Sequence, residues 1–135
     1  MPTYLEVFAA PIRDSEVAKV LIVAVMALTV ADVVFGVLNA LIHKEFQSSK
    51  MREGIAHKST TAGAIFVGCI IDATIGAGVD LGYSAPVLNS VCCYIILMEV
   101  ASLIETFGKL NPQFKGSPLY QLLAVSHVVE GERNA

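Results

Sequence analysis

The sequence predicts an all-α integral membrane protein with three transmembrane helices. Hydrophobic residues make up 55% of the 135-residue chain and charged residues only 16%, whereas a soluble domain carries about 25% charged residues. Apolar stretches long enough to cross about 30 Å of hydrocarbon occur three times. This composition argues against a soluble enzyme and against disorder. The formal net charge of −3 also argues against a nucleic-acid binder, which carries a basic surface.

The predicted transmembrane helices cover residues 17–42, 62–82 and 87–107. The second contains glycines that weaken a helix in water. In a bilayer the backbone must satisfy its own hydrogen bonds, so a helix remains the expected structure there. The third follows a tight turn, residues 82–86, in which Pro86 is placed to start the helix.

The other segments connect these helices or flank them. Residues 1–16 lack the basic start of a secretory signal, so we expect a retained N-terminal segment. It would lie partly in the interface through its apolar side chains, Tyr4, Leu5, Val7 and Phe8. Residues 43–61 are rich in charge and predict a solvated loop. Residues 108–135 form a tail in which 119–129 is either a short interfacial helix or an apolar patch on an irregular segment.

The distribution of Lys and Arg predicts the orientation. The N-terminal side of the first span carries two of them, Arg13 and Lys19. The opposite side carries the other seven, in the basic loop (Lys44, Lys50, Arg52 and Lys58) and in the tail (Lys109, Lys115 and Arg133). By the positive-inside rule, the loop and the C-terminus lie in the cytoplasm, and the N-terminus lies outside.

Acids without basic partners are the most informative feature of the spans. Asp32, Asp72 and Glu99 lie well inside them, and Asp80 and Glu105 lie nearer the ends. No Lys or Arg lies in residues 20–42, 62–82 or 87–107. Each central acid would cost about 2.5–3.5 kcal/mol at a bilayer centre on insertion scales. The acids therefore either are protonated and hydrogen-bonded or line a wet surface.

Helical spacing places these polar residues on defined faces. In the second span, small residues recur every four positions around Asp72, which permits close helix contact. We predict pore-lining or inter-helix roles for Thr29, Asp32, Asn39, Asp72, Asn89, Glu99, Ser102 and Glu105, and helix-packing roles for Gly36, Ala64, Gly68 and Gly76. The faces either pack together in a compact three-helix monomer or meet water between chains, which predicts a homo-oligomer.

The sequence gives little support for catalysis or for a cofactor. Cys69, Cys92 and Cys93 lie in apolar surroundings and fit small packing residues better than nucleophiles. Neither the cysteines nor the three histidines have metal-ligand spacing, so we expect no metal site. Glu99 and Glu105 resemble a carboxylate pair, but no nucleophile or cofactor motif accompanies them.

Four short motifs, in order, resemble the toxin-secretion/phage-lysis holin family of bacteria and their phages. Asp32 and Gly36 match its Asp-x-x-x-Gly signature near the end of the first span, and residues 48–58 match its Ser-Ser-x-x-x-x-Gly-x-x-x-Lys loop. Asp72 matches the acid of its second span. Residues 99–105 are similar to its Glu-x-x-Ser-Ile-x-Glu ending. The resemblance covers roughly residues 20–123.

This resemblance implies a non-enzymatic protein of the bacterial cytoplasmic membrane. Holins accumulate there, oligomerise at a set time and open lesions, through which an endolysin or a toxin reaches the cell wall without stable binding to the holin. Two alternatives remain open from the residues alone. One is a small ion channel or transporter subunit that uses the acids as a cation path. The other is a membrane scaffold or anti-holin that forms no pore.

Overall fold

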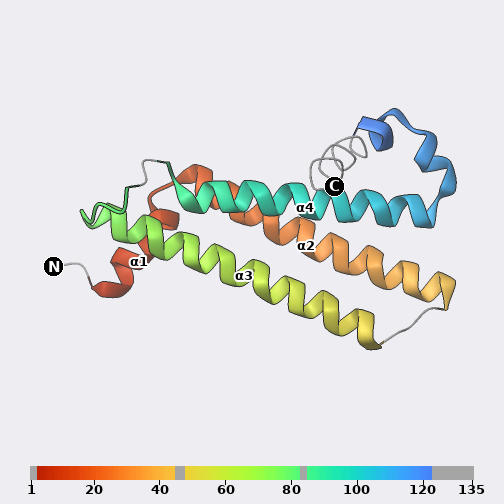
Figure 1. Ribbon diagram of the computed structural model, residues 1–135, viewed down its shortest axis with the longest axis horizontal. Coiled ribbons are helices and arrows are strands. Elements are labelled where there is room, and N and C mark those ends of the chain that lie inside the picture. Colours follow the sequence, from red (N-terminus) through yellow and green to blue (C-terminus); the bar gives the residue numbers. More distant parts are fainter. Residues whose placement is uncertain (1–2, 45–47, 83–84, 123–135) are drawn as a thin grey trace. The chain divides into compact units, whose positions relative to one another are not determined.

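The computed structural model describes residues 3–44, 48–82 and 85–122, and its regular elements there are all helices (Figure 1). They are α1 (Tyr4–Arg13), α2 (Glu16–His43), α3 (Ser48–Gly76), α4 (Val87–Leu110) and a short 3-10 helix, η1 (Pro112–Gly116). The whole of α2 and α4 and residues Met51–Gly76 of α3 are long and apolar enough to cross a membrane. The predicted fold class, an all-α protein with three spanning helices, is therefore confirmed.

Helix α3 differs from the sequence prediction at both ends. It begins at Ser48, so most of the predicted loop 43–61 is helical. In that stretch the hydroxyls of Ser59, Thr60 and Thr61 each donate to the carbonyl oxygen four residues earlier, at 2.9–3.0 Å. These side chains bond to their own helix instead of interrupting it, which hydropathy alone does not reveal.

The C-terminal end of α3 lies at Gly76 and not at the predicted residue 82. Gly78 follows with φ of +95°, a left-handed conformation that glycine adopts without strain. Its amide donates to the carbonyl of Ile75 at 2.9 Å, and the amide of Val79 donates to that of Thr74 at 3.2 Å. These bonds satisfy the last carbonyls of the helix and end it.

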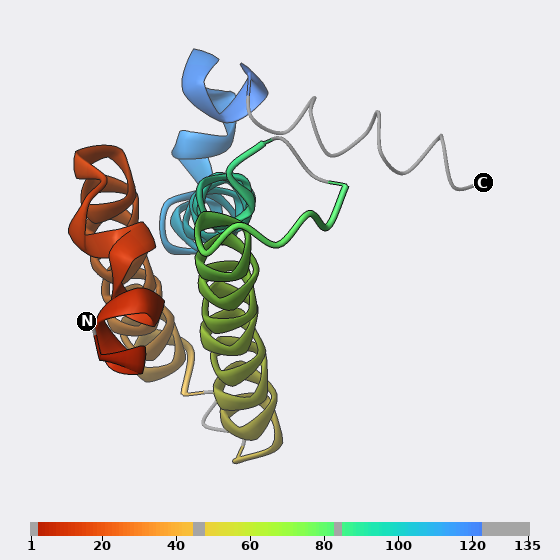
Figure 2. The same ribbon diagram turned by 90° about the vertical axis from the view of Figure 1, so that its left-hand side faces the viewer.

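The chain divides into two compact units, of which the first comprises Met1–Ala27 and Gln47–Ile96. Its core contains Ala18 and Val25 from α2 together with Leu88, Cys92 and Ile95 from α4. Ile12 from α1 and Ile65 from α3 pack against this cluster. The sequence did not predict helix α1. The N-terminal segment forms this helix, and it contacts α3 (Figure 2). Thr3 and Glu6 cap its start reciprocally.

The second unit comprises Leu28–Phe46 and Leu97–Ala135. A chain of edge-to-face aromatic contacts organises it, from Phe35 to Phe107 (ring centroids 4.8 Å apart), on to Phe114 (5.9 Å) and then Tyr120 (6.1 Å). A Cβ at Gly108 would lie 3.0 Å from the Tyr120 ring. The chain after α4 therefore folds back onto that helix. Of the predicted segment 119–129, residues 123–129 lie outside the described residues.

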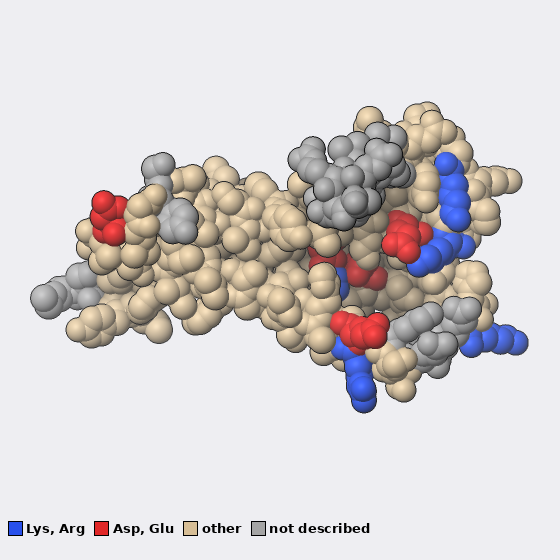
Figure 3. All heavy atoms as spheres, viewed as in Figure 1, with Lys and Arg blue, Asp and Glu red and all other residues tan. Residues whose placement is uncertain are grey.

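Much of the surface is apolar, as a lipid environment requires. On α2 only Ala18 and Val25 are buried, while large side chains such as Val20, Val23 and Met26 are 63–66% exposed. Most of the face in Figure 3 is free of charged atoms, and the acidic and basic side chains form small groups. A water-soluble monomer rarely exposes so many large apolar side chains along one helix. These side chains are the ones that the bilayer covers.

Candidate functional site

The polar residues of α2 and α4 meet in the second unit. Thr29 donates its hydroxyl to a carboxyl oxygen of Glu99 at 3.4 Å, and Ser102 donates its hydroxyl to a carboxyl oxygen of Asp32 at 2.6 Å. Both helices use an i, i+3 spacing, so the two contacts lie one turn apart. We call these four residues the α2–α4 seam. It joins the two polar faces predicted for the first and third spans.

Glu99 is the most deeply placed acid of this seam. Glu99 is only 3% exposed. Among the described residues it is the one charged or polar residue that is buried. Asp32 is half-buried and Ser102 is exposed. Each hydrogen bond of this kind contributes about 0.5–1.5 kcal/mol. The seam can therefore hold α2 and α4 together, and it would become a polar surface if the helices separated.

Asn39 continues the same face of α2, seven residues after Asp32. Its side-chain oxygen is buried and accepts no hydrogen bond within the described part of the chain. Its backbone carbonyl accepts from the ring of His43 at 3.0 Å. Because an unpaired buried amide oxygen costs about 1–3 kcal/mol, this position favours a further hydrogen-bond donor.

Asp72 has a different role from the seam acids. Its two carboxyl oxygens accept the backbone amides of Val87 at 2.8 Å and Leu88 at 2.9 Å, which are the first two residues of α4. These amides have no partner within their own helix, and the helix dipole favours a negative charge at this position. Asp72 therefore caps α4 from α3, a contact that sequence spacing could not predict.

The predicted packing residues of α3 divide into two kinds. A Cβ at Gly68 would lie 3.2 Å from the Cα of Leu88, so this glycine permits close approach of α3 and α4. Ala64, one turn earlier, is half-buried. In contrast, a Cβ at Gly76, or at Gly36 on α2, would meet no atom within 4 Å. Contacts of these two glycines with another chain stay a prediction.

The remaining predicted residues are distributed over several elements. Glu105 forms an exposed ion pair with Lys109 at 2.7 Å. Asn89 lines an open cavity of about 790 Å³ in the first unit, together with Arg13, Asp14 and Asp72. Of the predicted basic loop, Lys44 follows α2 with φ of +53°. Lys50, Arg52 and Lys58 lie on the N-terminal part of α3.

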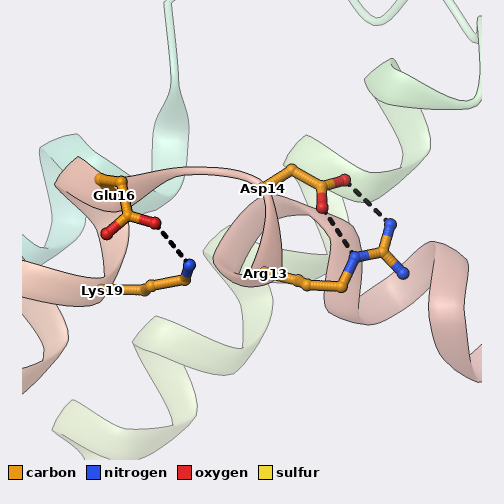
Figure 4. Close-up of polar contacts among 4 residues, drawn as sticks. All are labelled: Arg13, Asp14, Glu16 and Lys19. Atoms are coloured by element: carbon orange, nitrogen blue, oxygen red, sulfur yellow. Dashed lines mark hydrogen bonds and ion pairs between the residues drawn. The ribbon is translucent and has the colours of Figure 1, made fainter.

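Two ion pairs, which the sequence does not predict, flank the connection between α1 and α2 (Figure 4). Arg13 binds Asp14 through two hydrogen bonds, of 2.7 and 2.9 Å, and Lys19 binds Glu16 at 2.7 Å. The hydrogen bond from the guanidinium lowers the pKa of Asp14 and raises the pKa of Arg13. The first pair is therefore lost only as pH falls through the lowered pKa of Asp14.

The described residues contain no group of three or more His, Cys, Asp or Glu side chains that could hold a metal ion. All three cysteines are free thiols. Cys92 is buried in the core of the first unit, and Cys69 donates to the carbonyl oxygen of Phe8 at 3.2 Å.

Comparison with protein-family models gives a match over residues 16–125, to the model described as the bacteriophage holin family. The match includes all three membrane-spanning helices and both halves of the α2–α4 seam. Searches of curated proteins and of solved structures gave no significant match.

Proposed function

The chain belongs to the bacteriophage holin family, and from this premise we propose that it is a homo-oligomeric pore former. It accumulates in the bacterial cytoplasmic membrane and opens lesions through which an endolysin or a toxin crosses, which sets the time of host-cell lysis. The observation that carries this proposal is the α2–α4 seam, where Asp32 and Glu99 take hydroxyl donors from the facing helix. When α2 and α4 separate, these polar side chains line the lumen of the lesion.

The seam suggests how a closed chain gives way to an open lesion. While α2 and α4 are paired, their hydroxyls donate hydrogen bonds to the acids within one chain. When chains reach a critical density, contacts between chains replace the seam and the acids become hydrated. Solvation of the carboxylates offsets the lost helix–helix contacts. A lumen lined by a variable number of chains has no fixed diameter, unlike a filter with a coordinating ring.

Asn39 supports association in the same way. Its side-chain oxygen is buried and accepts no hydrogen bond from the described residues. A donor from water in a lumen or from a neighbouring copy would complete it. We place the N-terminus outside the cell and the N-terminal part of α3 in the cytoplasm, from the distribution of Lys and Arg.

Expression in bacteria, with and without a co-expressed endolysin, tests the proposal. We expect abrupt lysis only when both proteins are present, and loss of viability with release of a folded cytoplasmic enzyme into the periplasm when the chain is expressed alone. Leakage of ions without release of protein would indicate a channel or transporter subunit. An intact permeability barrier at high membrane levels of the chain would indicate a scaffold or anti-holin. Either result would overturn the proposal.

A further inference from the structure

Helix α1 leaves its large apolar side chains uncovered. Tyr4 is 89% exposed, Leu5 82% and Phe8 48%, and no residue of the helix is buried. Two residues separate its last residue, Arg13, from α2, the first of the membrane-spanning helices. The Cα atoms of Arg13 and Glu16 are three residue steps apart, so they lie at most about 11 Å from each other. Because α2 enters the bilayer, α1 must lie close to the bilayer surface.

Contacts in the first unit give the depth of α1. Asp72 bonds to the first two residues of α4, so it lies level with the start of that helix. Cys69 precedes Asp72 by one turn of α3, which places it about 4.5 Å further into the membrane. The thiol of Cys69 donates to the backbone carbonyl of Phe8 at 3.2 Å. Phe8 therefore lies about one helical turn below the level at which α4 begins.

Both basic side chains near α1 are paired with acids. Arg13 pairs with Asp14 and Lys19 pairs with Glu16, and a carboxyl oxygen of Glu6 accepts the backbone amide of Thr3 at 2.7 Å. Helices that need anionic lipid carry a polar face rich in Lys and Arg. The only such residue in α1 is Arg13, so burial of apolar surface must supply most of the attraction to a bilayer.

From the exposure, the depth and the charge pairing, we propose that α1 is an interfacial helix whose partner is the lipid bilayer. It lies along the lipid–water boundary, with Tyr4, Leu5 and Phe8 among the upper acyl chains. Its surface continues the lipid-facing surface of α2, where Val17 and Val20 are 60% and 66% exposed. Interfacial helices bury their apolar faces about 5–10 Å deep, and the position of Phe8 agrees with that depth. The inference does not depend on whether the chain opens lesions.

The absence of Trp from the chain provides the test. Phe8→Trp introduces a single fluorescent reporter on α1, and Phe66→Trp introduces a matched one on α3, where Phe66 is 67% exposed. The full chain would be reconstituted in phosphatidylcholine vesicles containing lipids brominated at shallow or deep acyl positions. We expect shallow bromines to quench Trp at position 8 most strongly, and deep bromines to quench Trp at position 66 most strongly.

Three further measurements decide the outcome. Replacement of part of the phosphatidylcholine by phosphatidylglycerol, or addition of salt, should leave quenching at position 8 unchanged. Leu5→Glu in the Phe8→Trp background should reduce that quenching, whereas Glu6→Gln should not. Water-like emission without quenching would overturn the proposal. Blue-shifted emission that no brominated lipid quenches would also overturn it, because another copy of the chain would then cover this face. Quenching that requires phosphatidylglycerol would refute the apolar mechanism.

Discussion

Asp72 lies on α3, but its carboxylate caps the N-terminus of α4. Both of its oxygens accept amides of the first turn of α4, and Pro86, immediately before that helix, has no amide to offer. The connection between α3 and α4 contains glycines with positive φ at positions 78 and 82. The first two amides of α4 are therefore capped by a side chain of α3 and not by a residue of the connection.

Asp72→Ala should therefore loosen the start of α4. The variant leaves two amides without their acceptor, and an unmade hydrogen bond to a poorly hydrated group costs about 1–3 kcal/mol. Hydrogen exchange in micelles should become faster at the Val87 and Leu88 amides. Asp72→Asn should be intermediate, because an amide side chain offers one acceptor oxygen and turns a donor toward the second N–H.

Asp80→Ala is the matched control for this variant. Asp80 is exposed, and its carboxyl oxygen accepts the amide of Gly82 within the connection itself. Its removal should leave exchange at Val87 and Leu88 unchanged. If Asp72→Ala also left exchange unchanged, water would be capping α4 and the carboxylate would be dispensable.

At the scale of elements, the close approach of α3 to α4 depends on a single glycine. Gly68→Ala places a Cβ 3.2 Å from the Cα and 3.4 Å from the amide nitrogen of Leu88. Backbone atoms cannot move aside as a flexible side chain can, so overpacking should cost about 1–3 kcal/mol. SDS-driven unfolding in mixed micelles, followed by circular dichroism, should show a lower midpoint.

Gly76→Ala separates this effect from a general effect of losing a glycine. A Cβ at Gly76 meets no atom within 4 Å, and alanine favours a helix more than glycine does. Its unfolding midpoint should equal or exceed that of the wild type. Equal midpoints for Gly68→Ala and the wild type would mean that α3 and α4 adjust their spacing freely.

The elements differ in how far the sequence could predict them. The spans 17–42 and 87–107 lie within a few residues of α2 and α4, because charged residues or a turn bound their apolar runs. Helix α3 begins before the predicted residue 62. Hydropathy does not reveal this start, because the hydroxyls there bond to carbonyl groups of their own helix. Spacing indicated polar faces on both α2 and α4. The individual pairs, such as Asp32 with Ser102, depend on helix register and required the structure.

At the scale of the whole molecule, the topology is a prediction that labelling can check. A variant without Cys69, Cys92 and Cys93 would receive a single new cysteine at Thr3, Arg52 or Asp80, all of which are exposed. A membrane-impermeant thiol reagent added to intact cells should label positions 3 and 80 but not 52, because most Lys and Arg residues lie on the side of position 52. Labelling at position 52 alone, before any lesion forms, would indicate the opposite orientation.

The proposed lesion makes a separate prediction about the seam acids. Asp32→Asn and Glu99→Gln retain an acceptor oxygen for Ser102 and Thr29, but a neutral amide cannot ionise. If hydrated carboxylates stabilise the lumen, both variants should insert and associate as the wild type does, yet lyse cells late or not at all. Lysis timing with a co-expressed endolysin, at matched membrane levels, measures this.

Ser102→Ala and Thr29→Val provide the opposite perturbation, since each keeps the acid and removes its hydroxyl donor. Loss of a seam contact in the closed chain costs about 0.5–1.5 kcal/mol, while the acids remain free to ionise in a lumen. These variants should therefore lyse cells earlier than the wild type, and the amide variants later. If the amide and hydroxyl variants shifted lysis in the same direction, the acids would act only as contacts between helices. Charge would then have no part in opening.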